Sequence, residues 1–286
     1  FDQVRKGRVW PGGLYIESAL DAARHVAEPN DAYLFGRVRR GGWWYYFPVV
    51  ATCKVPLGIA AIMLLGAISL RRRRPTFDEW SLALPAIAYT IALMAQSINI
   101  GWRHFLPAYV FMMLLATRCV AAPHPSRRRH LVLALAALSL LATILDTARY
   151  YPDVIAYLNW PRANAHLAIT DSNVDWGQGL KQAHAWLAAN ESLVRGRTVH
   201  LRAFGVSNRA IRHYLQGRVH TLHAGDRPPD SGLLILSPVC LTGISESHDE
   251  YAFLRGIEPD AIIGHTLRVY DLDRLLTSST RPRHPR

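Results

Sequence analysis

The chain has 286 residues, half of them hydrophobic, and 33 Lys and Arg residues against 21 Asp and Glu give a formal charge of +12. Such a charge is typical of nucleic-acid-binding proteins, but its distribution argues against that class. Residues 1–149 carry +10 and residues 150–286 only +2, so the basic excess lies in the half that also holds the long apolar segments. Three cysteines without C-x-x-C or metal-ligand spacing exclude a disulfide scaffold and a zinc module.

Residues 1–48 are predicted to form an outer loop. The chain starts at Phe1 without a signal-peptide pattern, and we interpret it as the C-terminal part of a longer protein. Residues 14–26 have a moderate helical period, which predicts a short helix on or near the outer membrane surface. Four consecutive aromatic residues, Trp43 to Tyr46, are typical of an interfacial aromatic belt.

Residues 49–149 are predicted to cross the membrane four times, because a bilayer core needs about 20 apolar residues of helix. The predicted spans are about 49–70, 80–97, 105–122 and 131–148. Arg118 lies near the end of the third span, where we expect it to snorkel to the interface. The alternative is a soluble protein whose four buried helices are joined by arginine clusters.

Two arginine clusters indicate the orientation of these spans. Residues 71–74 and residues 127–129 are all arginine, and they follow the first and third spans. The positive-inside rule places both clusters in the cytoplasm. Residues 1–48, the loop 98–104 and everything after Arg149 then lie on the outer side.

Residues 150–276 have the pattern of a small extracytoplasmic α/β domain. Strands are predicted at 198–205, 232–238 and 265–272, with helices at 207–216 and around 249–256. Alternation of strands and helices is typical of a layered α/β fold. The polar segment 277–286 is predicted to be a disordered tail. The predicted fold class is therefore an α-helical multi-pass membrane region of four spans followed by this small α/β domain.

Three segments, GGWWYYFPVVATCKVPL (41–57), GWRHFLPAYVF (101–111) and the stretch 150–182 with its DSNVDWGQGLKQ sequence, make the chain recognisable. They resemble the C-terminal half of the dolichyl-phosphate-mannose protein mannosyltransferase-like family, which are bacterial multi-pass GT-C glycosyltransferases. The DSNVDWGQ stretch is the most specific of these segments.

This resemblance implies a location in the bacterial inner membrane with the C-terminal domain on the periplasmic side. It also implies a polyprenyl-phosphate-linked sugar donor, an acceptor on the outer face and inversion at the sugar carbon. The family's acidic general base lies in a first outer loop that this sequence lacks, so no catalytic residue is assigned and the chain alone is expected to be inactive. We expect membrane lipid and the lipid-linked sugar as partners, with no nucleic acid, and no cofactor in this chain.

Two basic residues are candidates for the donor phosphate. Lys54 lies about five residues into the first span, where an unpaired ammonium is costly, and it either contacts the donor phosphate or snorkels to ordinary phospholipid. Arg103 lies in the short outer loop, where the family has an Arg-aromatic-x-x-Pro-like pattern, although His104 stands in place of the aromatic residue. Arginine can hold a phosphate bidentately, but a structural ion pair, for instance with Asp146, is the alternative.

The DSNVD segment permits three interpretations. Asp171, Asn173 and Asp175 begin like a calcium loop, but Trp176 and Gln182 stand where glycine and glutamate are needed. In a second interpretation, residues 171–173 cap the helix from Gly179 to Trp186. The resemblance implies a third role, in which Asp175, Trp176 and Gln178 contact the sugar or the acceptor.

The sequence favours a membrane glycosyltransferase over two alternatives. It contains no G-x-S-x-G, P-loop, H-E-x-x-H or G-x-G-x-x-G motif, so hydrolase, NTPase, metalloprotease and dinucleotide-binding functions have no support. One alternative is a non-catalytic membrane protein whose outer domain binds envelope glycan or a partner protein. The other, DNA binding driven by the positive charge, predicts a soluble protein.

Overall fold

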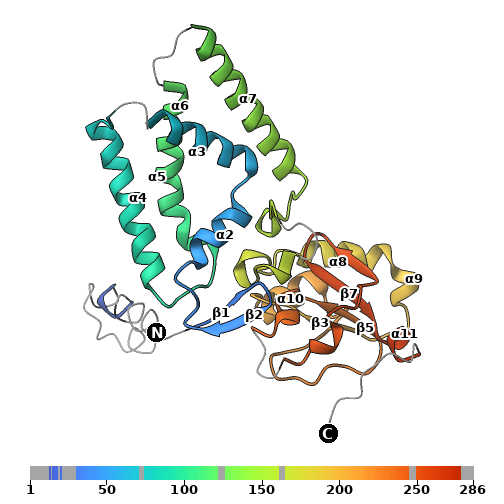
Figure 1. Ribbon diagram of the computed structural model, residues 1–286. Helices are drawn as coiled ribbons and strands as arrows, with labels where there is room; N and C mark the ends of the chain where they lie inside the picture. Colours follow the sequence, from blue (N-terminus) through green and yellow to red (C-terminus); the bar gives the residue numbers. More distant parts are fainter. Residues whose placement is uncertain are drawn as a thin grey trace.

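A computed structural model describes residues 13, 15–18, 20, 30–70, 74–121, 126–160, 165–244 and 249–277. The chain has a helical part that continues into an α/β part, and a short β-hairpin lies where the two meet (Figure 1). Most of the predicted surface helix at 14–26 and the predicted tail after Thr277 lie outside the described residues.

Within the described residues, the helical part contains the six α-helices α2 to α7 (Figure 1). In chain order they are α2 (Tyr46–Lys54), α3 (Leu57–Leu70), α4 (Phe77–Ala95), α5 (Leu106–Ala116), α6 (Arg118–Ala121) and α7 (Ser126–Ala148). α4 packs along α5, and α3 packs against α5 and α7. Gly58 allows the close approach of α3 to α7, since a Cβ there would lie 2.0 Å from the backbone oxygen of Ser139.

The first predicted span is not one straight helix. α2 ends at Lys54, Val55 is extended, and α3 begins at Leu57, so the two helices meet at 115°. Pro56 explains the break, because the ring of a proline disfavours the helical conformation of the residue before it. The third predicted span is also interrupted, since α5 ends at Ala116 and α6 begins after Thr117.

Within the described residues, one helix is long and apolar enough to cross a membrane by itself. It covers residues 127–148 of α7 and has a mean hydropathy of 2.1. The bent pair of α2 and α3 passes the same criterion if it is counted as one span. The prediction of four spans is therefore confirmed only as one or two candidate membrane helices.

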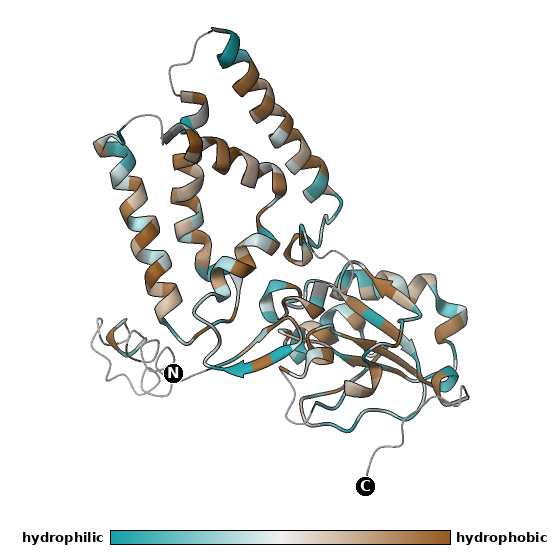
Figure 2. Cartoon of the chain, in the orientation of Figure 1, coloured by the Kyte–Doolittle hydropathy of each residue, from teal (hydrophilic) through white to brown (hydrophobic). Residues whose placement is uncertain are grey.

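The helical part exposes many apolar side chains of the kind that a protein surrounded by water buries in its core. Only 6% of the apolar stretch of α7 is buried, and Leu138 and Ile144 are each more than 60% exposed. Figure 2 shows apolar residues along most of α3, α5 and α7. Exposed apolar surface on this scale marks a contact with lipid or with another protein.

The expectation that Arg118 snorkels is wrong. Its side chain is only 6% exposed and forms an ion pair with Glu79 in the first turn of α4. Glu79 also accepts a hydrogen bond from the backbone of Thr76, which caps α4. A buried charge is stable when a charge of opposite sign pairs with it, and Glu79 supplies that charge inside the helical part.

The β-hairpin within residues 1–48 was not predicted. β1 (Asp31–Leu34) pairs antiparallel with β2 (Arg37–Arg40) through a turn at Phe35 and Gly36, both of which have positive φ. Two successive positive φ values are typical of the type I′ turn that suits a two-residue hairpin. The backbone N–H of Phe35 donates to Ala168, so the hairpin is fastened to the segment that follows α7.

The α/β part contains a mixed five-stranded sheet with the order β4-β3-β5-β7-β6. β3 lies parallel to β4 and β5, whereas β7 is antiparallel to β5 and β6. The strands are β3 (Val199–Arg202), β4 (His220–Thr221), β5 (Leu233–Leu236), β6 (Ala261–Ile263) and β7 (Leu267–Asp271). The three predicted strands are confirmed as β3, β5 and β7, while the short strands β4 and β6 were not predicted.

The helices of this part are α8 (Leu180–Ala189), α9 (Glu191–Val194), α10 (Asn208–Leu215) and α11 (Leu272–Thr277). α8 and α10 cover one face of the sheet, where Leu187 and Leu215 pack against Leu201 and Ile235. The other face carries Leu234, Leu236 and Tyr270. It is covered by residues 240–241 and 251–257, where the 3₁₀ turns η6 (Cys240–Thr242) and η7 (Ala252–Leu254) lie, and η7 stands in place of the helix predicted around 249–256.

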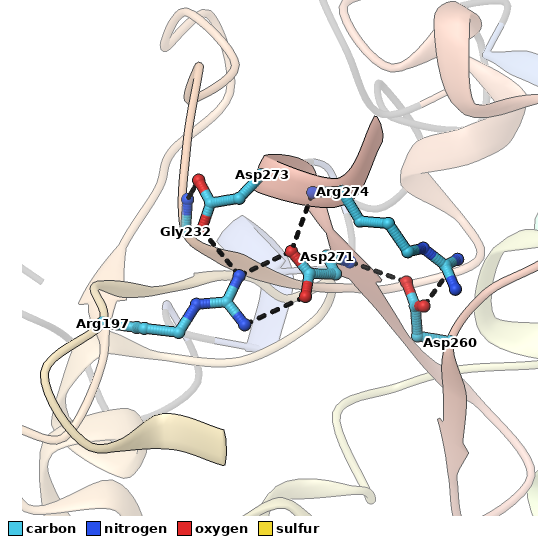
Figure 3. Close-up of polar contacts among 6 residues, drawn as sticks. All are labelled: Arg197, Gly232, Asp260, Asp271, Asp273 and Arg274. Carbon is cyan, nitrogen blue, oxygen red and sulfur yellow. Dashed lines mark hydrogen bonds and ion pairs between the residues drawn. The ribbon is translucent and has the colours of Figure 1, made fainter. Parts of the chain in front are cut away.

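An ion-pair network fastens one end of the sheet (Figure 3). Arg197 precedes β3 and donates two hydrogen bonds to Asp271, at 3.0 and 2.5 Å, and one to Asp273 at 2.7 Å. Asp273 in turn accepts from the backbone of Gly232, and Arg274 pairs with Asp260 at 2.6 Å. The network joins the entry to β3, the entry to β5 and the end of β7.

Candidate functional site

A cavity of about 310 Å³ lies where the helical part meets the chain that leads into the sheet. Its wall combines two cationic residues, Lys54 and Arg103, with two tryptophans, Trp102 and Trp176. The remaining wall residues are apolar or neutral polar, namely Leu106, Val154, Ile155, Tyr157, Ser172 and Asn173. The structure thus brings together both predicted phosphate ligands and one of the three predicted sugar contacts.

Lys54 is the last residue of α2, and its ammonium is held by three backbone carbonyls. It donates to Ile155 at 2.6 Å, to Tyr157 at 2.9 Å and to Asn173. The side chain is 9% exposed. An ammonium has three donors, and all three have protein acceptors here, so Lys54 fastens the end of α2 to the two segments that line the cavity.

Asn173 organises the same region, although the sequence suggested it only as a metal ligand or a helix cap. Its side-chain oxygen accepts from the backbone of Trp102 at 2.7 Å, and its amide donates to the hydroxyl of Tyr46 at 2.9 Å and to the carbonyl of Thr170 at 3.0 Å. The side chain is almost fully buried. Asn173 therefore connects the loop before α8 with α2 and with the start of the 3₁₀ helix η2 (Trp102–Phe105).

Arg103 is exposed, and its guanidinium lies over the indole ring of Trp176 at 4.8 Å from the ring centre. A guanidinium stacked through its flat face keeps its N–H edges free for bidentate contacts. The neighbouring His104 is half-buried, and its burial and the charge of Arg103 both lower its pKa. The alternative of an ion pair between Arg103 and Asp146 is not seen among the described residues, because Arg103 lies over Trp176 and Asp146 accepts a hydrogen bond from Tyr157 at 2.8 Å.

Asp171 is close enough to Arg103 to interact with its charge, and its backbone is strained, with φ at 62°. One oxygen of its carboxylate accepts from the backbone of Ser172 at 2.6 Å. Burial raises the pKa of Asp171 to about 6, although the hydrogen bond from Ser172 and the charge of Arg103 both favour the ionised form. This half-buried environment could not be predicted, since nothing local to the chain indicates it.

The other two predicted sugar contacts have different positions. Asp175 is fully buried, and its carboxylate accepts from the hydroxyl of Ser237 at 2.5 Å and from the backbone of Gly177 at 2.9 Å. A sugar contact at Asp175 is therefore contradicted, because the residue has no exposed surface. Gln178 is half-buried and holds its own turn through the backbone N–H of Trp176 and the carbonyl of Val174.

The two other interpretations of the DSNVD segment do not fit. Residues 171–173 form the 3₁₀ turn η5 (Asp171–Asn173), and the N-cap of α8 is Gly179, without a side-chain cap. The side chains of Asn173 and Asp175 bond to different partners, Trp102 and Ser237. Over the described parts of the chain, no group of three His, Cys, Asp or Glu residues is placed to hold a metal ion.

The aromatic run before α2 points in two directions. Tyr46 is 1% exposed and contributes its hydroxyl to Asn173, whereas Trp44 is 66% exposed. The backbone of Trp43 donates to Asn99 at 2.6 Å, which fixes the run to the loop before η2. Tyr46 thus belongs to the site, whereas Trp44 is exposed to the surroundings.

No protein-family model, curated protein or solved structure matches this chain.

Proposed function

We propose that this chain is part of an integral-membrane glycosyltransferase and that the cavity lined by Lys54, Arg103 and Trp176 binds the phosphate end of a polyprenyl-phosphate-linked sugar. The observation that carries the proposal is the meeting of Arg103, Trp102 and Trp176 around about 310 Å³ of space. In this proposal the chain crosses the bacterial inner membrane four times, with the α/β part on the periplasmic side, and the general base lies outside the present sequence.

The phosphate is assigned to Arg103. Its guanidinium is exposed and lies over Trp176, and its Nε–H donates to Nε2 of His104 at 3.4 Å, which leaves the N–H edges of the two terminal nitrogens for a ligand. Those edges match two phosphate oxygens. Lys54 belongs to the same wall, but its three protons are already bound to carbonyl oxygens.

The apolar part of the donor is assigned to the neighbouring wall. Leu106, Val154 and Ile155 are exposed at the cavity, and Leu106 starts α5 in the helical part. An isoprenoid chain there would remain next to the apolar surface of the helices. The ring of Trp176, which is 45% exposed, provides a flat apolar face of the kind on which a sugar can pack.

A binding measurement with the chain in lipid nanodiscs tests this assignment, with a polyprenyl monophosphate as the probe. Arg103→Gln should weaken binding at least about tenfold, because it removes hydrogen bonds to a charged group worth about 1.5–3 kcal/mol each. Arg103→Lys should give an intermediate loss, since lysine lacks the bidentate geometry. Arg209→Gln is the matched control, because Arg209 is an exposed arginine on α10, away from the cavity. Wild-type affinity in Arg103→Gln would refute the assignment.

A transfer assay separates the enzyme from the non-catalytic alternative. The complete protein, with any upstream segment, is incubated with a lipid-linked sugar, and release of the polyprenyl phosphate is measured. Release that depends on Arg103 supports the transferase. Tight binding of the donor without release under every acceptor tried would favour a membrane protein that only binds envelope glycan or a partner protein.

A further inference from the structure

A second, smaller cavity of about 80 Å³ lies in the α/β part, apart from the proposed donor site. It is enclosed by β7, by the chain at 254–259 and by residues 166–167. Two arginines, Arg255 and Arg268, line it together with His166 and Tyr270. None of these residues lines the larger cavity.

Arg268 is the unusual member of this set. It lies in the middle of β7 and is only 8% exposed, yet its one hydrogen-bond partner among the described residues is Nδ1 of His166, 3.0 Å from its Nη2. Burial and the charge of Arg268 lower the pKa of His166 to about 3, so the imidazole is neutral and does not balance the charge. A buried guanidinium has five N–H donors, and most of those of Arg268 have no acceptor in the described part of the chain.

The rest of the wall is arranged around this charge. Arg255 is held by the carbonyl of Leu241 at 2.5 Å and by the carboxylate of Asp249, so the second guanidinium has a fixed position. Leu254 and Ile257 supply apolar surface. Glu258 is exposed and belongs to the same wall, where its charge acts on Arg268 electrostatically, although no ion pair joins the two side chains within the described residues.

We propose that this cavity binds a single anionic group, a carboxylate or a phosphate, with Arg268 as its main ligand. A space of about 80 Å³ is large enough for one carboxylate or phosphate group. The anion would bring to the buried guanidinium the direct hydrogen-bonded countercharge that Glu258, which forms no ion pair with it among the described residues, does not give. Acidic sugars and phosphorylated molecules share this chemistry, and the site does not depend on the proposed donor binding.

Calorimetric titration of the full chain in detergent tests the proposal, with inorganic phosphate and glucuronate as separate probes and glucose as the neutral control. All titrations use the Arg103→Gln background, which removes phosphate binding expected at the larger cavity. Arg268→Gln should abolish binding of the anions. Arg202→Gln is the matched control, because Arg202 is equally buried and lies two strands away in the same row of the sheet but does not line the cavity.

Glu258→Gln provides a second variant at an exposed position where the fold is not at risk. It should tighten anion binding by about threefold or more, because it removes one like charge a few ångströms from the anion. Binding of phosphate alone or of glucuronate alone supports the site and shows whether it takes a phosphate or a carboxylate. The proposal is overturned if neither anion binds, if Arg268→Gln binds as well as its parent, or if Glu258→Gln leaves the affinity unchanged.

Discussion

Lys54→Met separates the two roles that the sequence allowed for this lysine. If the ammonium mainly fastens α2 to the cavity wall, the substitution should destabilise the protein before any ligand is added. Methionine has a similar length and is apolar, so it keeps most of the packing and removes only the three hydrogen bonds to Ile155, Tyr157 and Asn173.

The size of the effect follows from those contacts. Hydrogen bonds to a charged group contribute about 1.5–3 kcal/mol each, and removal of the ammonium leaves three carbonyl oxygens without this donor. Against this loss, the variant no longer buries a charge, which returns part of the free energy. Breaking one side of a buried charged network typically costs about 3–5 kcal/mol. At the lower end, this corresponds to a decrease in Tm of about 6–12 °C for a chain of this length.

Thermal unfolding in detergent, followed by tryptophan fluorescence, measures this change. Lys181→Met is the control, because Lys181 is an exposed lysine on α8 whose ammonium lies 5.9 Å from the ring of Tyr214. Its Tm should remain within about 1 °C of the wild type, as for most surface substitutions. A similarly small change in Lys54→Met would refute the fastening role. Weaker binding of polyprenyl phosphate together with an unchanged Tm would restore Lys54 as a direct phosphate ligand.

Three further substitutions test other parts of the structure by the same unfolding measurement. Arg197→Gln should cost about 1 kcal/mol at pH 7, because its ion pairs are partly exposed. The pKa of Asp271 is lowered by Arg197, so the stability from this ion pair is present above about pH 4 and is lost as the pH falls through the folded pKa. The difference in stability between the variant and the wild type should therefore vanish at low pH. A constant difference down to pH 2 would exclude the ion pair as its source. Asp171→Asn acts in the opposite direction: because the folded pKa is raised to about 6, the wild type should lose stability as the pH rises from about 4 to 6, and the variant should lack that loss. Parallel pH profiles of the two proteins would contradict the burial of Asp171. Glu79→Gln should cost about 3 kcal/mol by leaving Arg118 buried without its counter-ion, and adding Arg118→Met should recover most of it, whereas additive losses would argue against the pair.

The sheet of the α/β part could be predicted because its strands carry clear local signals. β5 is an apolar run between Gly232 and Ser237, β7 carries the strand-forming residues Val269 and Tyr270, and β3 is followed by a turn and the amphipathic helix α10. β4 and β6 have only two and three residues, which is too short for a periodic pattern. The hairpin at 31–40 did carry a signal in Phe35-Gly36, but its strands are short and one of them is almost entirely arginine and valine.

The helical part shows a different limit. Composition identified its apolar segments, but composition does not distinguish a straight span from two helices joined at an angle. Pro56 was visible in the sequence, and prolines are tolerated within membrane helices, so its effect at 115° depended on the contacts made by Lys54 on the other side of the bend. The fate of Arg118 likewise depended on Glu79, which lies 39 residues earlier in the chain.

The site was predicted in its members more than in their roles. Arg103 and Trp176 were singled out separately, and only the fold places one over the other. Asp175 and Asn173 have side chains that suit either a ligand or a buried network, and the choice depends on partners such as Ser237 and Tyr46 that are distant in sequence. Trp102 was missed altogether, because a single tryptophan in a short loop has no pattern around it.

The connection made by the loop at 171–176 has a consequence for the order in which the protein matures. Asn173 bonds to α2 and to η2, while Asp175, two residues later, bonds to Ser237 after β5. During synthesis the helices emerge first, and Lys54 and Arg103 then lack the wall that residues 154–176 provide. The residues that line the larger cavity end at Trp176, but Asp175 gains its partner Ser237 only when the chain has been made through β5. A ribosome-bound intermediate consisting of the helices alone would therefore lack one wall of the proposed donor site.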